Sequence, residues 1–201
     1  MTEPWHYTTC LDLLDHWQAL IAGVLGFAAA IGVVWITLTI EQRKLQREMD
    51  ALKKSLAIEL RQQVPHALRA GLALRGLASS QSPITARMLQ SLASVPAPMV
   101  YPATADKIGL LGQDAMDVVI IYSLIESGRG GVTMLINSRD PDNITPSTVA
   151  ATAGAFLSAS AYAQSVLPKL RTGVPEHDQK DAALIERVRA ATAQQSGSHA
   201  K

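Results

Sequence analysis

The chain lacks basic residues over its first 40 positions, although it holds 18 lysines and arginines in all. Within that stretch, residues 19–40 form an apolar run without charge or proline, in which Thr37 and Thr39 carry the only hydroxyl groups. At about 1.5 Å per residue the run is roughly 33 Å long, enough to cross a hydrocarbon core of about 30 Å. We therefore predict one transmembrane helix over residues 19–40.

Two other interpretations of this apolar run were weighed. A buried helix of a soluble protein rarely stays apolar on every face over such a length. A cleaved signal peptide would have a basic start, a shorter apolar core and a small-residue cleavage site. Here the lead segment carries Glu3, Asp12 and Asp15, and the run is followed by E-Q-R-K-L-Q-R. This flank is typical of a stop-transfer sequence, so we expect the helix to be retained.

The distribution of basic residues predicts the orientation of the helix. Residues 41–60 contain five lysines or arginines, whereas residues 1–18 contain none. Basic flanks stay on the cytoplasmic side, so residues 1–18 should be extracytoplasmic and the rest of the chain should lie inside the plasma (inner) membrane. Indole rings and basic side chains favour the headgroup region. The predicted interface anchors are Trp17, Trp35, Arg43, Lys44 and Arg47.

Cysteine is almost absent, since Cys10 is the only one. This excludes an intramolecular disulfide and a cysteine-based zinc site. On the predicted topology the Cys10 thiol lies outside, either free or in a disulfide between two copies. Residues 41–201 hold 18 basic and 14 acidic residues, a formal charge of +4, and the basic residues cluster only beside the predicted span. This charge is too mild for a nucleic-acid-binding domain.

Motifs of catalytic, metal or cofactor sites are also missing. The five histidines are scattered, and the sequence contains no H-E-x-x-H, G-x-S-x-G or G-K-[ST] pattern. Residues 128–131 are glycine-rich but follow a predicted helix, so we interpret them as a flexible corner or kink. Residues 140–143 lack the spacing of a calcium loop and are interpreted as a turn. We predict no catalytic residue, no metal ligand and no cofactor.

Helical signals fill the sequence after the apolar run. A juxtamembrane stalk helix is expected over 41–64, with a break or kink at Pro65, followed by a cytoplasmic helical domain over 65–193 and a disordered tail over 194–201. The stalk carries a stripe of apolar residues that fades at Glu59 and Gln63. The stripe either packs on its own domain or forms a short coiled coil. Its members are Leu45, Met49, Leu52 and Leu56.

Prolines and glycines divide the predicted domain. Ser82 and Pro83 predict the start of a helix to about residue 93, and the prolines of 95–102 predict an extended stretch. A helix over 103–111 should stop at Gly112, and Asp114 should cap a helix to 127. Further helices are expected from Pro146 to about 170, and, after a linker at 173–175, through Leu184, Ile185 and Val188.

One segment resembles a known group. The stretch V-Y-P-A-T-A-D-K-I-G-L-L-G over residues 100–112, followed by a helix with Val118, Val119 and Tyr122, resembles uncharacterised bacterial single-span membrane proteins. The resemblance implies a membrane helix that leads through a stalk into a small helical domain. It implies no activity.

The aromatic residues of this segment allow two interpretations. Tyr101, Ile108 and Tyr122 can meet at the packing centre of a helical hairpin. Alternatively, the two tyrosines recognise a ligand or partner. The candidate surface for that second role comprises Tyr101, Asp106, Lys107 and Tyr122.

The sequence therefore predicts an all-α protein in which one transmembrane helix continues into a stalk helix and a cytoplasmic helical bundle. The leading functional hypothesis is a membrane-anchored interaction or scaffold module. Its expected partners are the lipid bilayer, a second copy bound through the transmembrane and stalk helices, and an unknown protein. The alternative is a regulatory or sensory subunit whose helical domain binds a small ligand. An enzyme is the third hypothesis, and we do not expect it.

Overall fold

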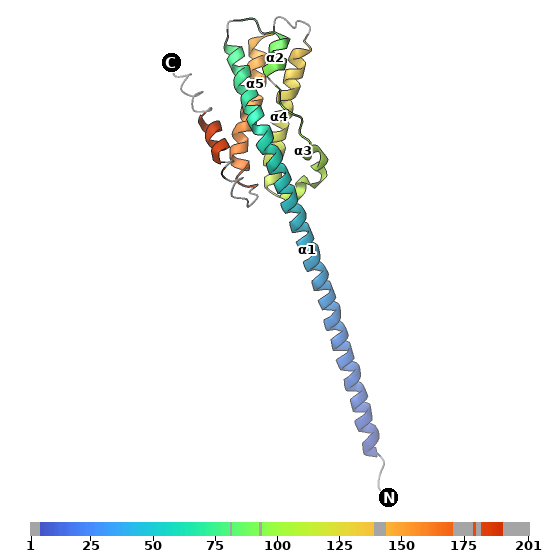
Figure 1. Ribbon diagram of the computed structural model, residues 1–201. Coiled ribbons are helices and arrows are strands. Elements are labelled where there is room, and N and C mark those ends of the chain that lie inside the picture. Colours follow the sequence, from blue (N-terminus) through green and yellow to red (C-terminus); the bar gives the residue numbers. More distant parts are fainter. Residues whose placement is uncertain are drawn as a thin grey trace. The chain divides into compact units, whose positions relative to one another are not determined.

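A computed structural model describes residues 5–80, 82–92, 94–138, 144–170, 179 and 182–190, with the backbone alone for 5–16, 19 and 92. All regular secondary structure in these ranges is helical, as the sequence predicts (Figure 1). The elements are α1 (Trp5–Ser79), α2 (Ala86–Leu92), α3 (Val100–Ala103), the 3₁₀ helix η1 (Ala105–Leu111), α4 (Asp114–Ile136) and α5 (Pro146–Val166). Residues 182–190 are also helical.

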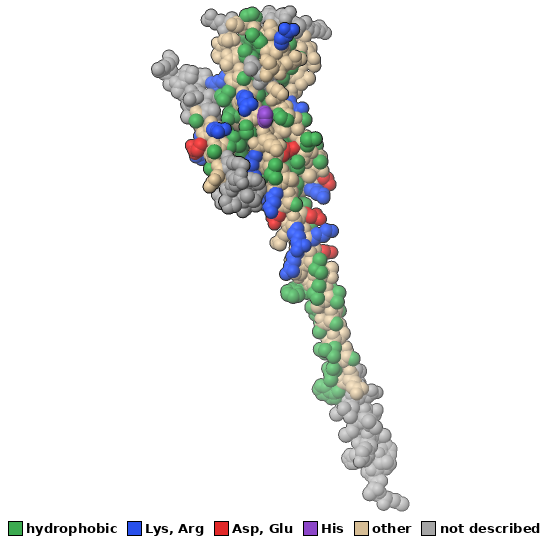
Figure 2. All heavy atoms as spheres, in the orientation of Figure 1, with side chains coloured by type: hydrophobic (Ala, Val, Ile, Leu, Met, Phe, Trp, Pro, Cys, Tyr) green, Lys and Arg blue, Asp and Glu red, His purple; other side chains and the backbone are tan. Residues whose placement is uncertain are grey.

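The chain divides into two compact units, Met1–Glu48 and Met49–Lys201. In the first unit, the apolar run of α1 exposes its large apolar side chains, and none of the residues in its most apolar stretch is buried. Figure 2 shows such side chains along the visible face of the helix. The Thr37 and Thr39 hydroxyls donate to the carbonyls of Val33 and Trp35, at 2.9 and 2.8 Å. Both hydroxyls of the apolar run thus donate to the backbone of their own helix, and α1 is a candidate membrane helix.

Helix α4 is also long enough and apolar enough to cross a membrane. It differs from the apolar run of α1 because one of its faces is buried in the second unit, including Val118, Ile121 and Ile125. A helix with one buried face is typical of the core of a globular unit.

Of the break or kink predicted at Pro65, the break is wrong, because α1 continues through this residue to Ser79. An internal proline removes one backbone hydrogen bond and costs about 3 kcal/mol in an isolated helix. On both sides of Pro65, α1 carries fully buried apolar residues, including Leu60, Val64 and Leu74. Burying each such side chain contributes about 1.5–3 kcal/mol, so the packed stripe outweighs the proline.

The second compact unit begins at Met49 and so includes part of the segment predicted as a stalk. Leu52 and Leu56 are buried in this unit, so for them the stripe packs on its own domain. Leu45, in the first unit, remains 52% exposed. Residues 49–64 therefore lie within the second unit.

The predicted corner at 128–131 is also wrong, because α4 runs without interruption from Asp114 to Ile136. The glycines allow α4 and α5 to approach closely. A Cβ atom on Gly128 would lie 2.6 Å from the Phe156 ring, and one on Gly131 would lie 2.8 Å from Thr152 Oγ1. Both distances are shorter than van der Waals contact, so these positions exclude larger residues for packing reasons.

The connections between helices correct further local predictions. Ser82 and Pro83 precede α2 without forming its first turn, because buried Ile84 accepts a hydrogen bond from Ile144 N–H outside the helix (3.3 Å). Part of the stretch predicted as extended forms α3, and residues 105–111 are 3₁₀ and not α-helical. The predicted stop at Gly112 is confirmed, since this glycine has a positive φ of 60°.

The predicted cap of α4 is wrong, whereas the predicted first residue of α5 is confirmed. Asp114 is the first residue of α4 and not its cap, and its carboxylate lies 3.7 Å from Lys53 Nζ. Pro146 begins α5 as predicted, although α5 ends at Val166 and not near residue 170. The 140–143 turn, the 173–175 linker, the 194–201 tail and the Cys10 side chain lie outside the described residues.

Candidate functional site

A buried carboxylate lies at the centre of the second unit. Glu59 follows Leu52 and Leu56 along one face of α1, so helical periodicity turns it towards the core. Only 6% of Glu59 is exposed. An acidic residue almost never takes such a position unless hydrogen-bond donors surround it.

Four donors meet the Glu59 carboxylate. Oε1 accepts from the backbone N–H groups of Met99 and Val100, the latter at 2.6 Å. Oε2 accepts from Tyr101 N–H at 3.0 Å and from the Tyr122 hydroxyl at 2.7 Å. The three N–H groups belong to the start of α3, where no helical carbonyl is available to accept from them. Glu59 therefore ties α1, α3 and α4 together through one group.

The surroundings of Glu59 favour its charged form. Burial alone would raise the pKa of the carboxyl, but the hydrogen bonds from Tyr122 and from the Val100, Met99 and Tyr101 N–H groups outweigh burial and lower the pKa below its ordinary value. Burial and the adjacent Glu59 charge raise the pKa of Tyr122. The pair is thus a carboxylate that accepts and a neutral phenol that donates.

The tyrosines of the predicted packing centre stack on each other. The Tyr101 and Tyr122 ring centroids are 4.2 Å apart, with 13° between the ring planes. Tyr122 is fully buried and Tyr101 is half-buried, while Ile108 is buried nearby in the same core. Tyr122 is therefore a packing residue, and its hydroxyl has the additional role of binding Glu59.

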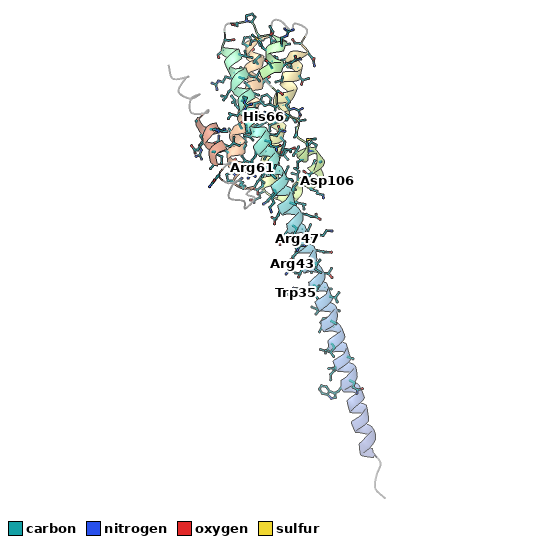
Figure 3. The ribbon with its side chains drawn as sticks, viewed as in Figure 1. Trp35, Arg43, Arg47, Arg61, His66 and Asp106 are labelled. Carbon is teal, nitrogen blue, oxygen red and sulfur yellow. The ribbon has the colours of Figure 1, made fainter. Side chains whose placement is uncertain are left out.

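The four residues of the candidate recognition surface do not share one exposed face. Asp106 and Lys107 are exposed on η1, where Figure 3 labels Asp106, but Tyr122 has no surface left for a partner. Sequence reasoning missed Glu59. The available signal was an acidic residue in register with a buried leucine stripe, which we interpreted as the fading of that stripe.

A groove of about 360 Å³ adjoins the Glu59 carboxylate. One wall is the 55–66 face of α1, and the facing wall is formed by residues of the 96–100 segment, including Met99 and Val100. Its lining is mostly apolar, with a few polar side chains that come from α1, and Figure 3 labels one of them, His66. A concave, mostly apolar site with a few convergent polar groups is the usual form of a small-molecule pocket.

One buried polar atom of the groove lining has no hydrogen-bond partner within the described part of the chain, namely Gln63 Oε1. Only 4% of Gln63 is exposed. The Ser55 hydroxyl is already engaged with Leu52 O at 2.9 Å, and Glu59 already accepts four hydrogen bonds. Gln63 is thus the buried lining residue whose side-chain acceptor is unused, and the other lining residues with side chains able to accept are Gln62 and His66.

The predicted interface anchors lie along α1 in the first unit. Trp17 and Trp35 are exposed, and Trp35, Arg43 and Arg47 follow one another along the helix (Figure 3). Lys44 is exposed as well. Basic side chains begin directly after the apolar stretch (Figure 2).

Within the described residues no group of three or more His, Cys, Asp or Glu side chains could hold a metal ion. No family model, no curated protein and no solved structure matches this chain. Its function must therefore be inferred from its own residues.

Proposed function

We propose that the protein is a membrane-anchored, non-enzymatic binding module. In this proposal α1 crosses the plasma (inner) membrane once, and the Met49–Lys201 unit is a cytoplasmic helical bundle that carries the interaction surface. Its proposed partners are the lipid bilayer, another protein, and a second copy of the chain bound through α1.

The observation that carries this proposal is the exposed apolar surface of α1. Large side chains such as Leu25, Phe27 and Trp35 are each more than half exposed along the apolar run. In water, a surface of this kind would cost about 25 cal/mol for each Å² of apolar area, so it requires a lipid or protein environment. The basic residues that follow supply the orientation, since they favour the cytoplasmic leaflet.

A second candidate function is that of a regulatory or sensory subunit whose helical unit binds a small ligand. The groove beside Glu59 supports it, because its volume and its mostly apolar lining are those of a ligand pocket. The two functions are compatible in one chain, since the anchor and the groove lie in different units.

Labelling of Cys10 tests the orientation, because it is the chain's only cysteine. A membrane-impermeant maleimide should label Cys10 in spheroplasts without permeabilisation. In a Cys10→Ser chain carrying Ser196→Cys, labelling should require permeabilisation. The reverse pattern would show that the bulk of the chain lies outside, and labelling of both sites in soluble extracts would remove the anchor from the proposal.

A further inference from the structure

The groove beside Glu59 has a definite chemical character. Its described lining contains one carboxylate, Glu59, one imidazole, His66, and no lysine or arginine. Glu59 is held in its charged form by four donors and has no acceptor capacity left. The wall therefore presents a negative charge that repels anions, without offering that carboxylate as a new hydrogen-bond acceptor.

Gln63 supplies the acceptor that Glu59 does not. Its buried Oε1 has no partner within the described part of the chain, and a buried acceptor in this state is costly. The last torsion of a glutamine side chain is soft and roughly two-fold, so rotation of the carboxamide can exchange the positions of its oxygen and nitrogen and turn the oxygen towards the groove. A ligand that donates a hydrogen bond would recover the free energy lost by burying this oxygen.

The apolar part of the lining determines the rest of the ligand. Ile58 of α1 and Met99 of the facing wall are both exposed at the groove, at 45% and 81%. A flexible methionine is a common feature of surfaces that adapt to apolar ligands. A volume of about 360 Å³ suits a small molecule and is near the lower end for ligand pockets.

We propose that this groove binds a small molecule with an apolar body and a neutral or cationic hydrogen-bond donor, which Gln63 Oε1 accepts. The inference rests on the second candidate function and is independent of the membrane orientation. Anionic molecules of the same shape are excluded by the Glu59 charge. The apolar body lies between Ile58 and Met99.

Three probes of matched shape test the proposal on the full chain in lipid nanodiscs: benzylamine, benzamide and benzoate. They share one ring and differ in charge and in donor groups. Binding is followed through the ¹³C-labelled Met99 methyl group, which is assigned with Met99→Leu. Benzylamine and benzamide should give saturable shifts with Kd in the millimolar range, and benzoate should give none at the same concentrations.

Gln63→Leu tests the acceptor. It should weaken benzamide and benzylamine binding about two- to tenfold, as expected for one lost hydrogen bond. Because it replaces an unpaired buried polar group by an apolar one, it should leave thermal stability equal or higher, which separates lost binding from lost folding. Gln90→Leu, an exposed glutamine of α2 outside the groove, is the matched control and should change neither quantity.

Three results would overturn the proposal: no saturable shift with any probe, equal binding of benzoate, or unchanged affinity in Gln63→Leu. None of them bears on membrane anchoring, which the Cys10 labelling tests separately. A nanodisc-embedded chain that binds no probe would leave the anchor intact and remove the ligand site alone.

Discussion

At the scale of single residues, the hydrogen bond between Glu59 and Tyr122 joins α1 to α4 inside the second unit. The pair lies 63 positions apart in sequence, and its 2.7 Å hydrogen bond is buried. Each group makes the burial of the other possible, since Tyr122 gives the carboxylate a donor and Glu59 gives the phenol an acceptor. Removing one of them therefore leaves a buried polar group unsatisfied.

Two substitutions of Tyr122 distinguish the stability that its ring contributes by packing from the stability that its hydroxyl contributes by hydrogen bonding. Tyr122→Ala should lower the free energy of unfolding by about 3–5 kcal/mol, the range for losing a large buried ring. Tyr122→Phe keeps the ring and should cost about 1.5–3 kcal/mol, the range for a hydrogen bond to a charged group. Urea unfolding of the chain from Met49 measures both, with exposed Asp106→Ala as a control expected within about 0.5 kcal/mol of wild type. An unchanged midpoint in Tyr122→Ala would contradict the buried position of the ring.

The depressed pKa of Glu59 predicts a pH dependence of stability. A carboxyl whose pKa is lower in the folded state stabilises the fold above its unfolded value of 4.5, and this stabilisation is lost as the pH falls below that value towards the folded pKa. The unfolding midpoint should therefore decrease on acidification below about pH 4.5, and less steeply in Glu59→Gln. At pH 7, Glu59→Gln itself should be destabilised, because an amide oxygen cannot accept from four donors. Identical acid profiles for the two chains would remove Glu59 from this role.

At the scale of elements, glycine determines how closely two helices pack. Gly128 faces the Phe156 ring of α5 and Gly131 faces Thr152, whereas nothing lies within 4 Å of a Cβ placed on Gly130. A cluster of glycines in sequence suggested a flexible corner. In the structure its members differ, because the two that face α5 are required by contact and Gly130 is exposed.

Alanine substitutions at Gly128 and Gly130 should have opposite effects. Gly128→Ala places a methyl group against a fully buried ring and should destabilise the unit by about 1–3 kcal/mol, the usual cost of overpacking. Gly130→Ala meets no neighbour and should stabilise α4 by about 0.5–1 kcal/mol, through the better helix propensity of alanine. Urea midpoints of the two variants give the comparison. Equal effects of the same sign would show that α4 and α5 do not pack through Gly128.

At the scale of the whole molecule, the described hydrophobic core belongs to one unit. The buried apolar residues begin at Leu52, after the boundary at Met49. A chain that starts at Met49 keeps all of them, together with Glu59 and its donors. Its length is within the range that can bury a single core.

The chain from Met49 should therefore be soluble and helical, with one cooperative thermal transition by circular dichroism. In cell fractions it should not sediment with membranes after a high-salt wash, whereas the full chain should. Gly26→Arg in the full chain is a point-mutation counterpart, since a charge near mid-span costs about 2.5–3.5 kcal/mol on insertion scales. Sedimentation of the shortened chain would instead indicate that α4, the second apolar helix, enters the bilayer.

Local signals in the sequence determined the features that depend on neighbouring residues only. The apolar run predicts a long exposed helix, Gly112 ends a helix through its positive φ, and Pro146 begins one because its fixed φ suits a first turn. Periodicity also predicted that Leu52 and Leu56 share a packed stripe. In each case the cause lies within a few positions along the chain.

Contacts between distant residues decided the rest. Helix α1 passes through Pro65 because its stripe is buried on both sides, and α4 passes through 128–131 because α5 packs there. Glu59 looked like the end of an apolar pattern, but it is buried because the Met99–Tyr101 backbone and Tyr122 donate to it. The donors to Glu59 are 40 or more positions away along the chain. The free energy of such long-range contacts exceeds the local preferences that the sequence displays.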